Sequence, residues 1–202
     1  RGLRAGDKVY LIDSFEGKKR WTAPREILGF IEKDGLPRAV FTKVEGDYVA
    51  QENEPFSVFP TGLARAEDVE RMEPRVDSLT IDDVFKLDKD TVTKIFTNTY
   101  EIWGAAVLLE RSETEREAVL VSVSSYKVGK LRKYLAEAEK ADSSDIKRQK
   151  ESFLKQLKAD ILTGDIVLPG TQEREAQVQA EQAEPEKEKE SKVAEQLSTP
   201  EK

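Results

Sequence analysis

The stretch Ile27-Leu-Gly-Phe-Ile-Glu-Lys-Asp-Gly-Leu-Pro-Arg-Ala-Val-Phe-Thr-Lys-Val44 decides the first half of the fold. Two runs rich in apolar, β-branched and aromatic residues, Ile27–Ile31 and Arg38–Val44, flank the dipeptide Asp34-Gly35. An Asp-Gly pair between two such runs is typical of a tight hairpin turn, because both turn positions favour residues that tolerate a positive φ. The stretch therefore predicts a β-hairpin.

Further strand-like segments lie on both sides of this hairpin. Lys8–Ile12 precedes it, and Tyr48–Ala50 and Phe56–Phe59 come after it, beyond a turn at Glu45–Asp47. Seven of the eleven glycines and five of the eight prolines lie within the first 74 residues. Short strands at close spacing, joined by Gly and Pro turns, predict a small β-barrel over residues 1–73.

From about residue 78 the apolar residues recur with helical spacing. Thr80–Asp83 and Ser112–Glu115 are typical of capping boxes, in which the first side chain and the fourth satisfy each other's backbone N–H groups. The run from Val92 to Val107 places its apolar residues on one face and predicts a single helix, capped by Asp88 or Asp90. Ala118–Val123 fits either a helix or a strand.

Two more helices are predicted in the last third of this region. The first begins near Ser125 and ends near Ala141, and the second begins after the polar break Asp142–Ser144 and ends at Thr163. Gly164 stands where a helix C-cap belongs. Because the link is short, we expect an antiparallel helix hairpin over residues 125–163 within a helical domain of residues 74–170.

Residues 171–202 differ in composition from the rest of the chain. They are rich in Glu, Gln, Ala and Lys, contain no aromatic residue, and hold 9 acidic and 5 basic groups. Such a segment cannot bury enough apolar surface to offset the entropy of ordering it. The sequence therefore predicts a disordered acidic tail.

Charge is distributed unevenly along the 202 residues. The chain has 33 Lys and Arg against 40 Asp and Glu, a net charge of −7, but residues 73–125 carry −5 whereas residues 126–158 carry +5. The basic block suits binding to the phosphate backbone of a nucleic acid, because clustered cations displace the counterions condensed on it. It equally suits an ordinary solvated surface, or one held by the acidic neighbouring segment. Its candidate binding residues are Lys127, Lys130, Arg132, Lys133, Lys147, Arg148 and Lys150.

The absence of two residue types excludes most catalytic designs. The chain contains no histidine and no cysteine. Disulfides, thiolate zinc sites, iron–sulfur clusters, histidine general bases and Ser-His-Asp triads are therefore excluded. A carboxylate-dependent enzyme stays open, but no pair of carboxylates stands out, so we expect neither catalysis nor a cofactor.

Four aspartates lie close together at Asp82, Asp83, Asp88 and Asp90. Carboxylates alone suit Mg²⁺ or Ca²⁺, but the spacing does not fit an EF-hand loop. Helix capping and the attraction of carboxylates to helix N-termini account for these residues. We therefore expect no metal site.

The densest cluster of cations and aromatic side chains outside the basic block lies in one early loop. Its members are Lys18, Lys19, Arg20, Trp21 and Arg25. A tryptophan beside cations in a turn-rich loop suits recognition of a partner. Alternatively, Trp21 closes one end of the barrel core.

The same region resembles a known motif. Gly6-Asp-Lys-Val-Tyr-Leu-Ile12, then Gly17-Lys-Lys19, is similar to the start of a KOW motif, and Val44-Glu-Gly46 resembles the next segment of that motif in a large-subunit ribosomal protein family. The resemblance covers residues 5–50, with a longer loop at Arg20–Glu26 than the family has. KOW motifs lie on SH3-like barrels of ribosomal proteins and transcription elongation factors. The resemblance implies RNA contact through Lys18, Lys19 and Arg20, with Trp21 stacking on a base.

Together these observations predict an α+β chain that acts as a non-catalytic structural or binding subunit of a larger assembly. A ribonucleoprotein such as an organellar ribosome is the most concrete form, with protein subunits and RNA as partners. The alternative is an acidic protein–protein adaptor without nucleic acid. No apolar run reaches the roughly 18 residues of a membrane span, so we expect a soluble chain. It begins at Arg1, which is compatible with an organelle-matrix protein after removal of a presequence, or with a fragment.

Overall fold

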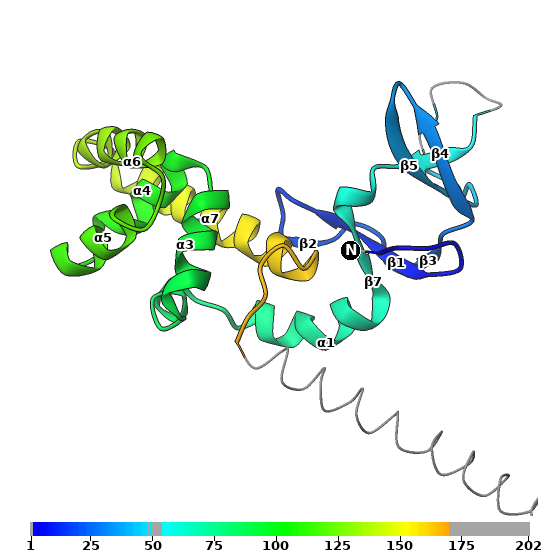
Figure 1. The fold of residues 1–202 in the computed structure, drawn as a ribbon, viewed down its shortest axis with the longest axis horizontal. Coiled ribbons are helices and arrows are strands. Elements are labelled where there is room, and N and C mark those ends of the chain that lie inside the picture. Colours follow the sequence, from blue (N-terminus) through cyan, green and yellow to red (C-terminus); the bar gives the residue numbers. More distant parts are fainter. Residues whose placement is uncertain (1, 48, 50–53, 170–202) are drawn as a thin grey trace, which may run out of the picture. The chain divides into compact units, whose positions relative to one another are not determined.

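The computed structural model describes residues 2–47, 49 and 54–169 (Figure 1). The chain divides into two units, Arg1–Val167 and Leu168–Lys202. In the first unit all strands lie before residue 66 and are followed by helices, so the prediction of a mixed chain of this order is confirmed. The predicted boundary at residue 73 lies inside the first helix, and the predicted tail at 171–202 lies outside the described residues.

The strands form two small antiparallel sheets. In the first sheet, β1 (Lys8–Asp13) pairs with three strands, which are β2 (Lys18–Lys19), β3 (Arg25–Glu26) and β7 (Leu63–Arg65). The second sheet has the order β4 (Gly29–Lys33), β5 (Leu36–Phe41) and β6 (Phe56–Val58).

The predicted hairpin is confirmed. Strands β4 and β5 pair from Gly29 opposite Val40 to Lys33 opposite Leu36. The turn residues Asp34 and Gly35 have φ values of 56° and 72°. Two successive positive φ angles match the right-handed twist of the flanking strands, which explains the Asp-Gly pair.

The prediction of a closed barrel is wrong. The chain crosses between the sheets at Ile27, which bonds to the Asp7 carbonyl, and Leu28, whose N–H donates to the Val40 carbonyl. It crosses back through the 3₁₀ turn Pro60–Gly62. A barrel needs an unbroken ladder of strands, but β6 pairs only with β5 among the described strands. The two sheets nevertheless share one core, which contains Val9, Trp21, Ile27, Ala39, Phe41 and Leu63.

Seven α-helices come after the strands in the described residues. They are α1 (Ala66–Asp77), α2 (Ile81–Val84), α3 (Lys89–Asn98), α4 (Glu101–Leu109), α5 (Glu113–Leu120), α6 (Ser125–Ala138) and α7 (Ser143–Leu162). Both predicted capping boxes are confirmed, at the start of α2 and of α5. Asp88 caps α3. The segment Ala118–Val123, which fitted either a helix or a strand, forms the end of α5 and continues beyond Leu120.

The predicted single helix from Val92 to Val107 is in fact two helices. Thr99 and Tyr100 have extended backbones, with ψ angles of 147° and 135°, and separate α3 from α4. The apolar residues keep their helical spacing across this break, so the periodicity gave no sign of it. The Thr99 carbonyl, which the break frees, accepts a hydrogen bond from the ammonium of Lys127.

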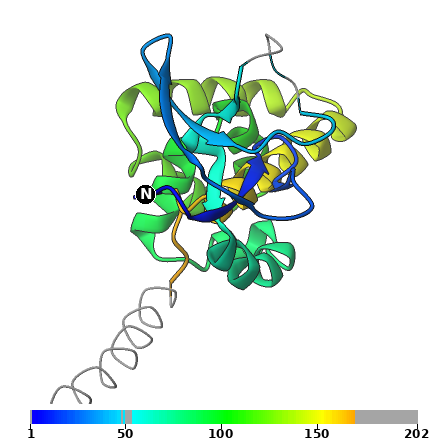
Figure 2. The same cartoon turned by 90° about the vertical axis from the view of Figure 1, so that its right-hand side faces the viewer.

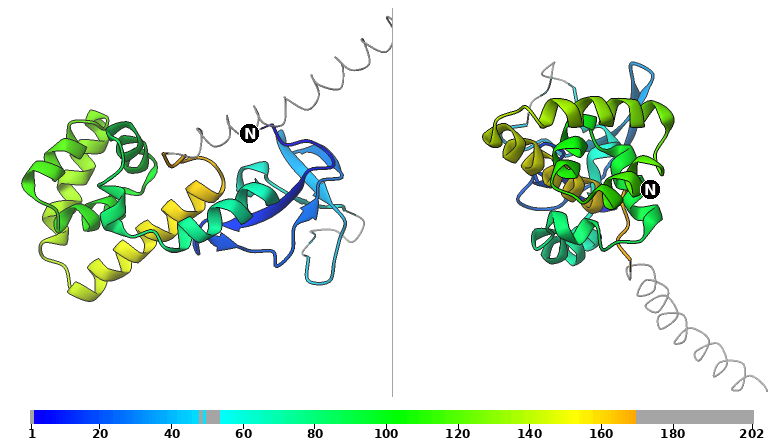
Figure 3. Two further views of the ribbon diagram at one scale, coloured as in Figure 1. Left: turned by 90° about the horizontal axis from the view of Figure 1, so that it is seen from below. Right: turned by 90° about the vertical axis from the view of Figure 1, so that its left-hand side faces the viewer.

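The last two helices do not form the expected hairpin. Ser124, rather than Ser125, caps α6; Asp142 caps α7, and Gly164 comes after α7 with a φ of +75°, as the C-cap prediction requires. Each helix packs on α4 more than on the other (Figure 3). Small residues on α4 allow this close approach: a Cβ on Gly104 would lie 3.2 Å from a Leu131 methyl group.

Helix α7 also joins the helices to the strands. It contacts α1, β1 and β2 (Figure 2). Gly17, in the β1–β2 turn, lies so close to α7 that a Cβ there would stand 2.3 Å from the Lys155 carbonyl oxygen. The turn around Gly17 is therefore fixed against the helix backbone.

Candidate functional site

The site that the structure assembles lies where the loop Arg20–Glu26 meets the loop Thr42–Asp47. Trp21 is 8% exposed and packs on Phe41, with ring centroids 5.0 Å apart in an edge-on arrangement, and on Phe56 at 6.3 Å. The guanidinium of Arg25 lies over the Trp21 ring, 4.4 Å from its centroid, and 5.3 Å from that of Phe56. Such stacking orients the cation and holds both loops to the core.

Asp47 completes this arrangement from the second loop. Its Oδ2 accepts a 2.7 Å hydrogen bond from Arg25 Nη1 and a 2.9 Å bond from the Val44 amide. The Asp47 side chain is 7% exposed, and burial by itself would raise its pKa. The bonds from Arg25 and Val44, with the charges of Arg25 and Lys43, outweigh burial and hold the pKa of Asp47 below its ordinary value.

Two hollows flank the Trp21–Arg25 stack. The larger has a volume of about 500 Å³ and the smaller about 320 Å³, and Arg20, Trp21 and Arg25 line both. The larger is also lined by Thr22, Ala23, Pro24, Glu26, Thr42 and Val44. The smaller is also lined by Leu11, Glu45, Gly46, Asp47, Phe56 and Val58. We call the two hollows and the stack between them the Trp21–Arg25 site.

Arg20 is the cation that this site leaves available. Arg25 is committed to Asp47, whereas the guanidinium of Arg20 makes no hydrogen bond or ion pair with any described residue. Its backbone is fixed, since its N–H donates to the Leu11 carbonyl at 2.8 Å. The site thus combines apolar walls with one anchored guanidinium that has no ion-pair partner among the described residues, and each hollow also has a carboxylate in its wall, Glu26 in the larger and Glu45 in the smaller.

The other loop cations predicted to bind a partner lie elsewhere. Lys19 donates a 2.8 Å hydrogen bond to Glu73 of α1, which raises the pKa of Lys19, and its ammonium lies 4.9 Å from the centre of the Tyr10 ring. Lys18 is exposed and lies 3.7 Å from Glu16. Lys19 is therefore part of the contact between the first sheet and α1.

The stacking role that the KOW resemblance implies for Trp21 does not fit the structure. Its ring is buried, with Phe41 and Phe56 against it and Arg25 over it. A base needs a free aromatic face. The alternative prediction, that Trp21 closes the core, agrees with its place in the core cluster.

The predicted cations of α6 and α7 lie near carboxylates, with one exception. Glu101 of α4 lies 3.6 Å from Lys127 and 3.8 Å from Lys130, while Glu117 pairs with Arg132 at 3.4 Å and Glu110 with Lys150. Lys133 pairs with Glu137 and Arg148 with Asp145 along their own helices. Lys147 has no such partner among the described residues.

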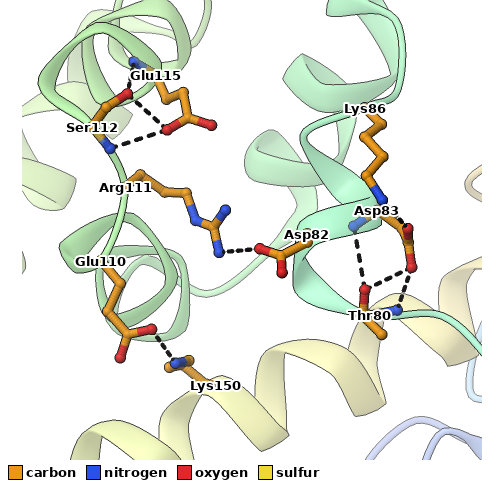
Figure 4. A network of polar contacts seen from close by, with 9 residues as sticks. All are labelled: Thr80, Asp82, Asp83, Lys86, Glu110, Arg111, Ser112, Glu115 and Lys150. Carbon is orange, nitrogen blue, oxygen red and sulfur yellow. Dashed lines mark hydrogen bonds and ion pairs between the residues drawn. The ribbon is translucent and has the colours of Figure 1, made fainter.

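These pairs agree with one of the interpretations of the charge pattern. Glu101, Glu110 and Glu117 belong to the acidic segment 73–125, and they reach across to cations of the basic segment 126–158. Figure 4 shows one part of this network, in which Glu110 meets Lys150 near the Asp82–Arg111 pair, whose separation is 2.6 Å. Much of the basic block is thus neutralised within the molecule.

The clustered aspartates serve helix starts, as predicted. Asp83 closes the capping box of α2, and its bonds with Lys86 and Thr80 lower its pKa to about 2. Asp88 caps α3, and Asp82 pairs with Arg111. No group of three or more potential metal ligands lies together in the described part of the chain.

Several members of the site could not be predicted from the sequence. Asp47 and Val44 come from a loop that we assigned only to a turn and a strand end, and Phe56 from a short strand. The turn at Glu45–Asp47 was visible in the sequence, but its position against Trp21 depends on pairing between distant segments.

Comparisons with protein-family models, curated proteins and solved structures found no match. Among the described residues, no helix is long and apolar enough to cross a membrane.

Proposed function

We propose that this chain is a non-catalytic binding subunit of a larger assembly, and that it holds a segment of a partner protein at the Trp21–Arg25 site. The observation that carries this proposal is the pair of hollows around a rigid aromatic–cation stack, with Arg20 unpaired at both. Arginine and tryptophan in pre-organised surroundings are the residue types that dominate protein–protein binding energies. The partner segment supplies a carboxylate to Arg20 and an apolar side chain to a hollow.

The residues that line each hollow indicate which chemical groups of a partner would bind there. Pro24 and Val44 line the larger hollow, and Phe56 and Val58 line the smaller one. These apolar side chains suit aliphatic or aromatic groups of a peptide, which lose their water on binding. Arg25 and Asp47 neutralise each other, and Glu26 and Glu45 add one carboxylate to the wall of each hollow, so Arg20 offers a local contact for a carboxylate rather than a net positive site.

An SH3-like arrangement of strands is part of this proposal, in an open form because no strand pair joins the two sheets among the described residues. Strand β1 pairs with the last strand, β7, and the chain passes from one sheet to the other between β3 and β4. The relation to KOW domains stays a proposal that rests on the residues of Gly6–Ile12 and Gly17–Lys19. In a ribonucleoprotein such as an organellar ribosome, the same site would contact a protein neighbour.

Protein is favoured over RNA because few of the predicted cations are free. Lys19 is held by Glu73, Arg25 by Asp47, and the cations of α6 and α7 largely by the acidic helices. RNA affinity grows with the number of phosphates that free cations can neutralise. Cations that are already paired with carboxylates therefore add little to the affinity for RNA.

The test is recovery of the native assembly with the tagged full chain as bait. We expect Arg20→Glu to lose at least one protein partner that the wild type retains, while Lys140→Glu retains it. Lys140 is a matched control, since it is exposed and unpaired among the described residues but far along the chain from the site. Equal recovery by both variants would overturn the proposal. A fluorescein-labelled 20-nucleotide RNA that binds at low salt and is lost with Arg20→Glu would replace protein by RNA as the partner.

A further inference from the structure

The outer face of the second sheet is a separate apolar surface. Alternation along β5 places Leu36, Arg38 and Val40 on the face opposite to Ala39 and Phe41, which are in the core. The register adds Ile31 of β4, opposite Arg38, to the outer face. This face therefore points away from the Trp21–Arg25 site, whose aromatic contacts are on the core side.

Several apolar side chains around this face are exposed. Leu36 is 51% exposed, Phe59, which comes directly after β6, is 44% exposed, and Ile31 is 37% exposed. Exposed apolar residues scattered singly are ordinary, but a cluster on one sheet face marks an interaction surface. Figure 1 and the left view of Figure 3 place the β4–β5 hairpin at the side of the strands away from α4 and α6, so these two helices do not cover this face.

Arg38 gives the surface its chemical character. Its guanidinium lies 4.3 Å from the centre of the Phe59 ring and makes no hydrogen bond or ion pair with any described residue. Its Nε is buried without a partner. The neighbouring cation Lys33, by contrast, is paired with Glu54 at 2.7 Å. A guanidinium that lies over an aromatic ring, without an ion-pair partner and on a face with exposed apolar side chains, is suited to receive a carboxylate.

We propose that this outer face, centred on Arg38 and formed with Ile31, Leu36, Val40 and Phe59, is a second docking surface for a partner protein. The occupant is a segment in which an aspartate or glutamate is flanked by apolar side chains. The carboxylate pairs with the Arg38 guanidinium, and the apolar side chains cover Leu36, Ile31 and Phe59. The proposal does not depend on the Trp21–Arg25 site, and with it the chain joins two partner segments.

A second copy of this chain does not fit the surface. In a two-fold symmetric dimer the same patch meets itself, so the Arg38 side chain at its centre would face another Arg38. Like charges brought together in a partly desolvated interface oppose binding. A partner of opposite charge therefore suits the face better.

The experiment uses a phage-displayed library of random 12-residue peptides, selected on the immobilised full chain. Phage that bind the immobilised Arg38→Ala variant are first removed, because their peptides do not need the Arg38 side chain. We expect the remaining peptides to share an acidic residue between apolar ones. The strongest synthetic peptide should bind the wild type in calorimetry and lose at least 10-fold in affinity with Arg38→Ala or Leu36→Ser.

Two controls separate this surface from other causes. Arg20→Glu and Phe15→Ser, where Phe15 is 79% exposed on another loop, should leave the peptide's affinity unchanged. A peptide with Lys in place of its acidic residue should bind Arg38→Glu better than it binds the wild type, and this result needs no stable Arg38→Ala. The proposal would be overturned if no peptide that binds the wild type remained after depletion, if the remaining peptides lacked a carboxylate, or if Arg20→Glu abolished binding. Dimerisation of the full chain in analytical ultracentrifugation that Arg38→Ala abolishes would also overturn it, because a second copy would then occupy the face.

Discussion

At the scale of single residues, Gly17 is the glycine among the described ones at which a side chain meets both a positive φ and a close backbone neighbour. Its φ of +64° disfavours any side chain, and a Cβ would stand 2.3 Å from a carbonyl oxygen of α7. Gly35 is a natural comparison, because its φ of +72° is similar and nothing lies within 4 Å of a Cβ there. Any difference between the two substitutions therefore reports on the contact of the β1–β2 turn with α7.

We predict that Gly35→Ala lowers the free energy of unfolding by about 1 kcal/mol, the cost of a left-handed backbone for an L-residue. Gly17→Ala should cost roughly 3 kcal/mol or more, because the backbone of the turn or of α7 must also shift. Urea denaturation of both variants measures the difference. Equal losses would show that the turn does not rest on the helix.

Asp47 provides a pH-dependent prediction at the same scale. Its pKa is lower in the folded state than in the unfolded chain, so it stabilises the fold above the unfolded value of about 4. This stabilisation is lost as the pH falls through the folded pKa. Asp47→Asn should therefore reduce stability at pH 7 more than at pH 3.

Free energies of unfolding at the two pH values, for the wild type and for Asp47→Asn, check this prediction. Glu45→Gln, an exposed neighbour in the same loop, is the control. A loss for Asp47→Asn that is the same at both pH values would mean that Asp47 does not titrate with folding.

The local signals in the sequence were the reliable ones. The Asp34-Gly35 turn, the capping boxes at Thr80 and Ser112 and the C-cap at Gly164 were all predictable, because each depends on residues within a few positions. The Arg25–Asp47 pair was not predictable, because it joins two loops 22 residues apart. The site is made by such pairs, so only Trp21, Arg25 and Arg20 could be named in advance.

At the scale of elements, α4 is the helix against which α6 and α7 pack. Glu101 in its first turn holds Lys127 and Lys130 of α6. The side chains of Glu101 and Lys127 are only 19% and 12% exposed. Breaking a largely buried pair leaves a charge without compensation, which costs more than breaking an exposed pair.

We predict that Glu101→Gln lowers the free energy of unfolding by about 2 kcal/mol, within the range for a buried charge that loses its partner. Glu137→Gln removes an exposed pair with Lys133 on α6 and should cost less than about 0.5 kcal/mol. Thermal and urea unfolding compare the two. A loss of similar size in both variants would mean that α4 and α6 are held by packing alone.

The break between α3 and α4 and the position of α6 could not be read from periodicity. The spacing of apolar residues continues through Thr99 and Tyr100. The Thr99 carbonyl has no partner within a helix, and the hydrogen bond that it accepts from Lys127 stabilises the break. The predicted hairpin failed for a similar reason. Link length favours neighbouring helices, but the small residues Gly104, Ala105 and Ala106 make α4 the better surface for packing.

At the scale of the whole molecule, the charge pattern has a structural meaning. The acidic segment 73–125 and the basic segment 126–158 carry −5 and +5, and they meet in ion pairs between α4, α5, α6 and α7. The basic block is thus largely balanced inside the fold. The two surfaces that we propose for partners, the Trp21–Arg25 site and the outer face around Arg38, lie outside this block.

We predict that substituting Lys127, Lys130 and Arg132 by Gln changes stability more than it changes any affinity for RNA. Their carboxylate partners would be left unpaired, whereas phosphate contacts would be few. Unfolding curves and anisotropy with a labelled 20-nucleotide RNA at 50 mM salt, read on the same variant, check this. A large fall in RNA affinity without a change in stability would restore the nucleic-acid interpretation of the basic block.

Photo-crosslinking from within the Trp21–Arg25 site tests most directly whether a partner protein binds there. A benzophenone side chain replaces Val44, which is 45% exposed and lines the larger hollow, and the control position is Val121, which is 74% exposed beyond α5. In the native assembly, we expect a crosslink from position 44 to one defined protein chain and none to that chain from position 121. Crosslinks to RNA alone, or the same products from both positions, would contradict it.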